Sequence, residues 1–502
     1  MPTAPRRSSS RAAAQYNAAV GLSPRLARCL TLVALALGAC DRAPPGPDLG
    51  RLYRVGTQFA DITPVIVVPG LFGSKLRDRT TGVEVWPGTA RMLLFDNYRQ
   101  LALDFDRTTL AVRSDNLEAF DIADAALGED FYGKIITTLH DFGGYVHGVV
   151  GVPPQAGERR YYIFPYDWRQ DNVEAARGLD RLIESIRRDY GDPALRVDIV
   201  AHSMGGLVAR YYQRYGTDDV LDGRESQVTL YGTSRVRKLI LLGTPNMGSA
   251  SSLHAFLIGE AIGFGRIPQE ALATLPSGYE LFPHPLVTWL IDVSGHVRHD
   301  DLFDGKTWRR YRWSIFDPAV EARIRAAHGA DADAYLAALG RFFDYRLERA
   351  RRFLWALSTP EPPTQIRYVL FGGDCDLTPA RLALEDVGGT PTARLYPDQI
   401  VSRVPGVPYA ALMLEPGDGS VTKPSLLARE TLDPSAPQNA DSFIPVAYWF
   451  FLCEQHEKLT GNINFQDNLL NVLLTRRLPW EMEPHAAQEA SVPGRQPNPS
   501  AK

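Results

Sequence analysis

A serine between a strand-like and a helix-like segment is the feature that most constrains how this chain can fold. Residues 197–201 form a mostly apolar run typical of a buried strand, and residues 207–212 continue with a helical pattern. Ser203 stands between them, with Ala201 two residues before it and Gly205 two residues after it. Because a sharp strand-to-helix turn has no room for larger side chains at those positions, the spacing predicts that the turn exposes the Ser203 hydroxyl. A chance pattern in a loop is the alternative, but the flanking strand and helix favour a catalytic nucleophile.

The same turn indicates where a developing negative charge would be stabilised. The Met204 amide, at the expected helix start, can point at an oxyanion. The second amide usually comes from a loop after an early strand, and residues 69–73 form such a loop after the apolar run 64–68. Its two glycines let the backbone approach a substrate closely. Leu71 is the first candidate for this second amide and Phe72 the next, and the alternative is an ordinary glycine turn.

Strand-like runs alternate with helical patterns over most of the chain. The runs lie at residues 64–68, 161–164, 197–202, 236–242 and 366–371, and a helix is expected around 173–190. This alternation predicts a mostly parallel sheet flanked by helices. Together with the serine turn, it indicates an α/β-hydrolase domain over residues 61–480. Between about 250 and 360 the strand signal is weak, so we expect a helical cap or lid inserted there.

The N-terminal region has the pattern of an export signal. An apolar run at residues 30–37 follows two arginines, and it is shorter than the ~20 residues that span a bilayer. Residues 37–40 also resemble a bacterial lipobox, which predicts lipid attachment at Cys40; an ordinary signal peptide is the alternative. We therefore expect a signal peptide over 1–39, a tether over 40–60, and a membrane-anchored lipoprotein of the bacterial cell envelope. The tail at 481–502 is predicted to be disordered.

Composition excludes some partners and leaves one question open. A net charge of -4 without a long basic stripe gives no electrostatic case for nucleic acid. The chemistry expected of Ser203 needs neither a cofactor nor a metal.

Four cysteines are too few for a disulfide scaffold. In an oxidising compartment Cys375 and Cys453 can pair and brace the site, or remain as two free thiols.

An activated serine needs a general base and a carboxylate that orients it, and in this fold the chain order is serine, acid, histidine. The histidines after Ser203 are His254, His284, His296, His299, His328, His456 and His485. The base should follow the last strand, which excludes the five histidines of the predicted cap. His485 lies in the predicted disordered tail. His456 is therefore the predicted base, with an exposed surface histidine as the alternative.

Two aspartates are candidates for the acid. Asp376 follows the run ending at Phe371, and Asp418 lies in a Gly-Asp-Gly turn. Both segments are turns that favour Asp and Gly for backbone reasons alone. The residues by themselves do not decide between the two carboxylates.

Five segments together match the motifs of a known family. They lie at residues 65–76, 165–169, 201–206, 243–249 and 275–283. In this order they resemble the lecithin:cholesterol acyltransferase family, which also includes lysosomal phospholipase A and the phospholipid:diacylglycerol acyltransferases. Ala201, which departs from the usual glycine of the serine turn, fits the family's A-H-S-M-G-G pattern.

The resemblance bears on the acid and on the substrate. It implies Asp418, because residues 417–421 match the family's catalytic turn, whereas its turn matched at Thr378 is not catalytic. The region of His456 matches less completely, and the family's disulfide near the active site does not correspond to Cys375 and Cys453. Asp167 and Arg169, in the segment 165–169, are expected to form an ion pair that braces the loop beside the serine turn.

The implied activity is transfer of an acyl group from a phospholipid-like ester to Ser203, and from there to an alcohol or to water. The membrane surface, reached through the N-terminal anchor, would be the place of action. A phospholipase or esterase that uses only water is the first alternative. A catalytically silent envelope lipoprotein that binds a ligand or partner is the second.

Overall fold

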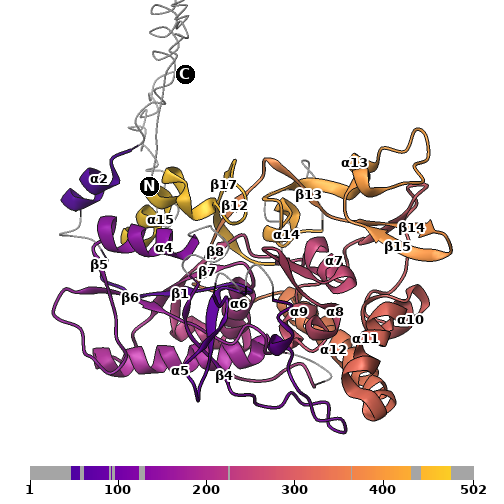
Figure 1. Cartoon of the computed structure of the whole chain (residues 1–502). Coiled ribbons are helices and arrows are strands. Elements are labelled where there is room, and N and C mark those ends of the chain that lie inside the picture. Colours follow the sequence, from indigo (N-terminus) through magenta and orange to yellow (C-terminus); the bar gives the residue numbers. More distant parts are fainter. Residues whose placement is uncertain are drawn as a thin grey trace, which may run out of the picture. The chain divides into compact units, whose positions relative to one another are not determined.

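The core of the computed structural model is a seven-stranded sheet (Figure 1). The structure describes residues 47–56, 61–89, 92, 96–123, 131–223, 227–362, 364–430 and 443–475. Every adjacent strand pair of this sheet is parallel. In spatial order the strands are β17 (Val446–Leu452), β12 (Arg367–Gly373), β8 (Val236–Leu242), β7 (Val197–His202), β1 (Val65–Val68), β6 (Arg159–Ile163) and β5 (Tyr145–His147). The predicted strands are therefore present, and they form the expected parallel sheet.

Helices cover both faces of this sheet, as Figure 1 shows. The flanking helices are α4 (Phe131–Thr137), α5 (Asn172–Tyr190), α6 (Met204–Tyr215) and α15 (Ile463–Leu474). Ile66 and Val68 of β1 belong to the hydrophobic core that includes α5 and α6. Val65 and Val67 belong to the core that includes α4 and α15. Since successive strand residues point to opposite faces, a strand covered on both sides must be apolar at every position.

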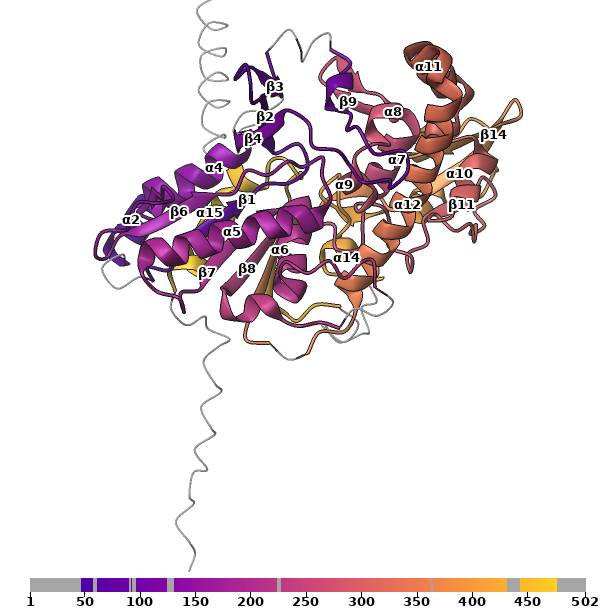
Figure 2. The same cartoon turned by 90° about the horizontal axis from the view of Figure 1, so that it is seen from below.

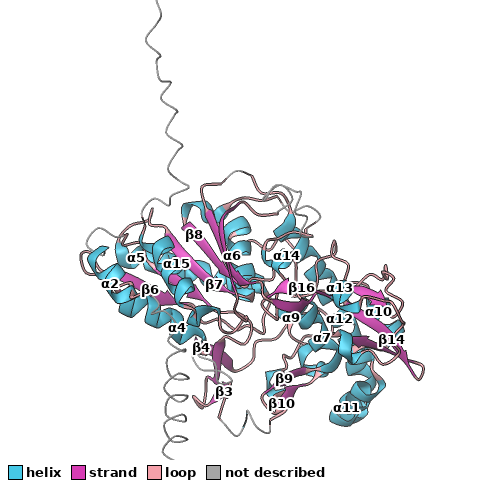
Figure 3. Ribbon diagram, turned by 90° about the horizontal axis from the view of Figure 1, so that it is seen from above, coloured by secondary structure: helices cyan, strands magenta, loops and turns pink. Residues whose placement is uncertain are grey.

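The insertion between β8 and β12 contains the helices of the predicted cap. They are α7 (Ala250–Ile258), α8 (Gln269–Leu272), α9 (Pro276–Tyr279), α10 (Gly305–Tyr311), α11 (Pro318–His328) and α12 (Ala332–Ser358). Figures 2 and 3 show that α7, α10, α11 and α12 lie to one side of the parallel sheet. The cap is therefore built largely of helices, as its weak strand signal indicated.

The cap region also contains strands, which the sequence did not predict. The hairpin β9 (Glu260–Ile262) and β10 (Gly265–Ile267) follows α7. Strand β11 (Leu290–Asp292) pairs with β14 (Leu382–Val387), which pairs with β15 (Thr390–Arg394). Most of these strands are three residues long, too short to show an alternating pattern. Residues beyond β12 thus contribute to the cap, which extends past the predicted limit of about 360.

Shorter elements surround the sheet. Strand β2 (Ser74–Asp78) pairs with β3 (Glu84–Trp86) and β4 (Leu117–Ile122), and β13 (Asp376–Pro379) pairs with β16 (Leu414–Gly417). Two short helices are α13 (Tyr409–Met413) and α14 (Lys423–Leu426). The β13–β16 pair holds both candidate acids, because Asp376 lies opposite Gly417 and Asp418 follows directly.

The predicted tether is partly wrong. A helix, α2 (Leu49–Gly56), forms inside residues 40–60. Leu49 and Tyr53, one helical turn apart, lie on the same face. Leu49 is buried, and the Tyr53 hydroxyl donates to the backbone oxygen and the carboxylate of Asp467 in α15, at 2.7 and 2.8 Å. Folded structure therefore begins before residue 61.

Several N- and C-terminal predictions lie outside the described residues. These are the signal peptide, the lipid attachment at Cys40, and the tail at 481–502 together with His485. Among the helices of the described segments, none has both the length and the apolar composition needed to cross a membrane.

Candidate active site

Ser203 occupies the turn between β7 and α6 with a backbone that few residues adopt. Its φ is 51°, in the region that is uncommon for any residue other than glycine. The Ser203 amide donates to the backbone oxygen of Leu242 at 2.8 Å. A Cβ added at Gly205 would lie 2.3 Å from the Pro69 carbonyl oxygen, and Ala201 is fully buried. The small residues are therefore required because the turn packs directly against β1 and the loop that follows it.

His456 and Asp418 form a buried hydrogen-bonded pair. Nδ1 of His456 lies 2.8 Å from Oδ2 of Asp418, and the His456 amide donates to the Asp418 carbonyl oxygen at 2.8 Å. The other carboxylate oxygen accepts from the amides of Ser420 and Val421, at 3.0 and 2.7 Å. This orientation leaves Nε2 of the imidazole for a second partner. Both residues have the contacts expected of a base and the acid that orients it.

The electrostatics of the pair favour the charged imidazole. Burial lowers the pKa of His456, but the charge of Asp418 and its hydrogen bond outweigh burial, so the pKa lies above its ordinary value. A carboxylate in this position stabilises the imidazolium that forms when the base accepts a proton.

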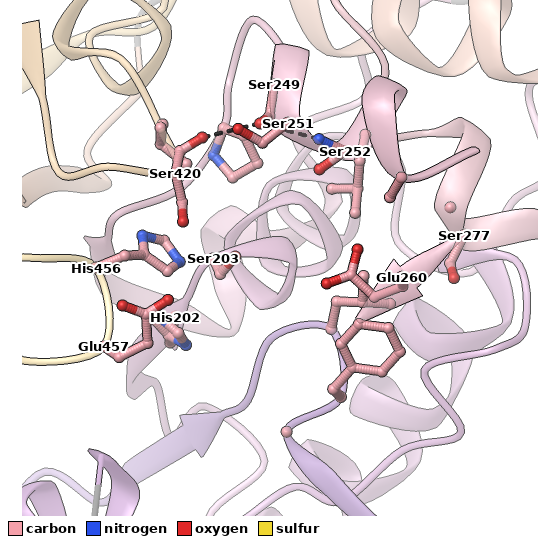
Figure 4. Close-up of a pocket in the computed structure, with 18 of the residues that line it drawn as sticks. His202, Ser203, Ser249, Ser251, Ser252, Glu260, Ser277, Ser420, His456 and Glu457 are labelled. Carbon is pink, nitrogen blue, oxygen red and sulfur yellow. Dashed lines mark hydrogen bonds between the residues drawn. The ribbon is translucent and has the colours of Figure 1, made fainter. Parts of the chain in front are cut away.

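His456 and Ser203 line the same cavity, and Figure 4 shows the imidazole beside the serine. The Ser203 hydroxyl makes no hydrogen bond with the described residues, and such contacts often tighten only when substrate is bound. The structure brings Asp418, and not Asp376, to the imidazole. The open choice between the two carboxylates therefore falls on Asp418 by geometry.

The loop predicted to supply the second oxyanion amide lies against the serine turn. A Cβ added at Gly70 would lie 2.8 Å from Cβ of Ser203. Leu71 and Phe72 both line the cavity, and their amides donate no backbone hydrogen bond to a described residue. Met204 is the first residue of α6, where amides have no partner within the helix. All three candidate amides are thus available, and the structure favours neither Leu71 nor Phe72.

A tyrosine and a histidine that the sequence analysis missed connect this loop to the serine turn. The Tyr132 hydroxyl accepts from the Gly70 amide at 2.8 Å and lies 2.9 Å from Nδ1 of His202. Burial, and then the nearby His456, hold the pKa of His202 well below its ordinary value, so the ring is neutral. His202 could have been identified from the sequence, because it directly precedes Ser203. Tyr132 lies 71 residues before Ser203, in a segment without a motif.

The loop at residues 165–169 contains the predicted ion pair. Arg169 binds Asp167 at 2.8 Å, and it also binds Asp115 at 2.6 Å. The Tyr166 hydroxyl donates to the Pro69 carbonyl oxygen at 2.9 Å. The ion pair therefore supports a loop that holds the start of the Gly70–Gly73 turn.

A disulfide joins Cys375 to Cys453, with their Cα atoms 4.9 Å apart. The alternative of two free thiols is wrong for this structure. The cysteines follow the ends of β12 and β17, where Gly373 is paired with Leu452. The bond therefore fixes these two strand ends close to His456.

The cavity over Ser203 has a volume of about 340 Å³, within the range of small-molecule sites. Most of its lining is apolar and comes from the Leu71 loop, from α4 and from the cap. The apolar lining residues include Leu71, Phe72, Phe131, Phe256, Ile262, Leu272, Leu275 and Leu281. The cap histidines do not line this cavity. Among the described residues, no cluster of His, Cys, Asp or Glu could hold a metal ion.

One solved structure supports the fold, and two lipase structures match it more weakly. A chain in the crystal structure of the Tle4–Tli4 complex has a TM-score of 0.52 and 17% identity, over 82% of this chain and 98% of that chain. The mature lipase BlEst2 of Bacillus licheniformis has a TM-score of 0.31 and 12% identity, over 82% and 92%. The lipase of Staphylococcus hyicus has a TM-score of 0.30 and 13% identity, over 86% and 95%. A search of curated proteins found no match.

The family resemblance is confirmed over part of the chain. The sequence model of the lecithin:cholesterol acyltransferase family matches residues 149–301. This range contains four of the five resembling segments, among them the serine turn, whereas Asp418 and His456 lie outside it. Residues 149–301 are therefore similar to the lecithin:cholesterol acyltransferase family, on a chain with an α/β-hydrolase fold.

Proposed function

We propose that this protein is a serine enzyme that takes an acyl group from a phospholipid-like ester and passes it to an alcohol or to water. The observation that carries the proposal is the Asp418–His456 pair, whose imidazole lies beside Ser203 and lines the same mostly apolar cavity. The family match supports a lipid ester hydrolase or acyltransferase. The apolar lining suits an acyl chain, because it buries hydrocarbon away from water.

In the first half-reaction, His456 accepts the Ser203 proton while the serine oxygen attacks the ester carbonyl carbon. Asp418 keeps the imidazole in the required tautomer and stabilises its positive charge. The Met204 amide and one amide of the Leu71–Phe72 turn stabilise the oxyanion. Collapse of this intermediate releases the lipid alcohol, which takes the proton from His456 and leaves an ester on Ser203.

In the second half-reaction, an acceptor hydroxyl attacks this ester. His456 takes the acceptor proton and returns it to the serine oxygen when the acyl–serine bond breaks. An alcohol as acceptor makes the protein an O-acyltransferase of the lecithin:cholesterol acyltransferase type, and water makes it a phospholipase. We propose the transferase because cap residues line the cavity and add apolar side chains around the ester, a setting that favours an alcohol acceptor over water.

The decisive experiment uses phospholipid vesicles with a labelled acyl chain and a long-chain alcohol, with wild type and Ser203→Ala in parallel. Labelled alkyl ester identifies transfer, and labelled fatty acid alone identifies hydrolysis. Equal product from both proteins, or none from either, would reject a serine enzyme.

We also propose that the protein is anchored in the cell envelope through a lipid on Cys40, on the basis of the lipobox-like residues 37–40. An anchor would keep the cavity close to its lipid substrate. Cells that produce the protein are grown with a labelled fatty acid. We expect label on the wild type and none on Cys40→Ser, which should move from the membrane fraction to the soluble fraction.

A further inference from the structure

Glu260 is a carboxylate in the wall of the mostly apolar cavity. It is the first residue of β9, in the hairpin that follows α7. Figure 4 shows the carboxylate on the right-hand wall, pointing into the pocket toward Ser203 and His456. The residue is half-buried and therefore open to the cavity. A charged side chain is unusual in such a wall, because transferring it from water to apolar surroundings is costly.

No described residue compensates for that cost through direct contact. Glu260 makes no hydrogen bond or ion pair within the described part of the chain. The nearest opposite charge is that of Arg266 on β10, but its guanidinium donates to the carbonyl oxygens of Ile258 and Gly259. Arg266 therefore acts on the carboxylate only through space. The bonding capacity of the carboxylate is therefore free for a molecule that enters the cavity.

Two serine hydroxyls belong to the same cavity lining as this carboxylate. Ser251 and Ser252 belong to the first turn of α7 and line the upper wall in Figure 4. Their hydroxyl groups have no hydrogen-bond partner among the described residues. Ser249 and Ser277, by contrast, donate to the carbonyl oxygens of Ser420 and Trp168, so they are already satisfied. The cap wall therefore contributes three polar side chains with free bonding capacity, opposite the catalytic pair.

The chemistry of this polar group suits a neutral hydroxyl better than a cation. Burial raises the pKa of Glu260 to about 7, although the charge of Arg266 opposes the shift. A carboxyl group that is protonated part of the time attracts a cation weakly, but it hydrogen-bonds a hydroxyl in either state. The serine hydroxyls can donate to an alcohol oxygen or accept from it, whereas an ammonium group cannot accept a hydrogen bond.

We propose that Glu260, with Ser251 and Ser252, binds the hydroxyl group of the alcohol that accepts the acyl chain. This inference rests on the proposed function and specifies its second half-reaction. The bound alcohol attacks the acyl carbon on Ser203, a new carbon–oxygen bond forms, and the bond to the serine oxygen breaks. The alcohol proton passes to His456 and then to the serine oxygen. Glu260 holds the acceptor in place and takes no net proton.

The test measures how one acyl-enzyme divides between two acceptors. A p-nitrophenyl ester acylates the protein in buffer that contains a long-chain alcohol, and alkyl ester and fatty acid are quantified together. Their ratio does not depend on how fast the acyl-enzyme forms, so a general loss of activity leaves it unchanged. We expect Glu260→Leu to lower the ratio of alkyl ester to fatty acid by about tenfold, because the acceptor loses a hydrogen bond in the cavity. Glu260→Gln, which keeps the shape and one acceptor oxygen, should lower the ratio less.

A matched control is available in the same lining. Glu457 also lines the cavity but is exposed to solvent, and Glu457→Leu should keep the wild-type ratio. An unchanged ratio in both Glu260 variants would overturn the inference, and so would a wild type that makes fatty acid but no alkyl ester with any alcohol. In both cases the serine enzyme itself would stand. If Glu260→Leu kept the wild-type ratio but, in a second assay with phospholipid vesicles, changed the preference among lipid head groups, the carboxylate would recognise the donor, and the inference would be wrong.

Discussion

The two walls of the cavity differ in how their polar groups are bonded. On the wall formed by the sheet, the Asp418 carboxylate, the His456 imidazole and the Tyr132 hydroxyl all have partners within the protein. On the wall formed by the cap, Glu260 and two serine hydroxyls have none among the described residues. These internal hydrogen bonds hold the general base and the loop at Gly70 in one geometry, as catalysis requires. Polar groups without internal partners are available to a ligand, so this wall is suited to selecting the substrate.

The largest expected effect comes from removing the nucleophile of the sheet wall. Ser203→Ala should lower ester turnover by about four orders of magnitude or more, because no other group can form the acyl-enzyme. The measurement is steady-state hydrolysis of a soluble ester, with thermal unfolding as a control for the fold. Turnover within tenfold of wild type would show that the chemistry lies elsewhere.

The next effect separates the two candidate acids. Asp418→Asn should lower kcat by about 10³ to 10⁴, because the imidazole loses the carboxylate that sets its tautomer. Asp376→Asn should stay within about threefold of wild type, since Asp376 has no contact with His456. Comparable losses in both variants would contradict the geometry of this wall.

The Asp418–His456 pair predicts how kcat/KM depends on pH. His456 accepts a proton only when it is neutral, and Asp418 holds its pKa above the ordinary value. Wild-type kcat/KM should therefore fall as the pH decreases through that raised pKa. In Asp418→Asn the residual activity should persist to lower pH, because the attraction for the proton is gone. A pH profile of kcat/KM for both proteins measures the direction of this shift. If kcat/KM of the variant fell at a higher pH than that of the wild type, the prediction would be contradicted.

A smaller effect is expected at the hydrogen bonds that join the loop to the serine turn. Tyr132→Phe leaves the buried Gly70 amide unpaired, which costs ~1–3 kcal/mol, and it removes the partner of His202. We expect kcat to fall about tenfold with little change in KM, because the oxyanion amides lose their support. Tyr98→Phe is the control, since that buried hydroxyl donates to the Pro87 carbonyl oxygen and does not line the cavity. Equal effects of the two changes would mean that Tyr132 acts through general stability.

The smallest effect on activity is expected at the disulfide. Replacing Cys375 and Cys453 together by serine should change kcat less than about threefold, because strand pairing still aligns β12 with β17. Stability should decrease by about 4 kcal/mol, the order expected for a bond that closes a loop of 78 residues. Denaturant unfolding of both proteins measures this difference. A large loss of kcat at unchanged stability would show that the bond positions His456 directly.

Much of the wall formed by the sheet was predictable from the sequence. Its strands and helices show periodic patterns between neighbouring residues, and its candidate catalytic residues follow a known order along the chain. The predicted helix around 173–190 is α5, and the continuous apolar run at 64–68 corresponds to β1, which is buried on both faces. The cap wall was less predictable. Strands of three residues, such as β9, have no periodicity that distinguishes them from loops. No sequence pattern therefore singled out Glu260, and its proposed role is inferred from its position in the cavity.

The sequence by itself determined the serine turn, because the steric demand for Ala201 and Gly205 acts between neighbours in the chain. It also determined the base, because the order of elements in the fold leaves His456. The residues alone left Asp376 and Asp418 open and the family resemblance implied Asp418, but only the tertiary structure shows that Asp418 is the carboxylate that reaches the imidazole. It also decided the disulfide, the bridging role of Tyr132, and the position of Glu260 in a mostly apolar cavity without a bonding partner among the described residues. The physical reason is that these depend on distances between groups far apart in sequence, which are set by strand order and helix packing.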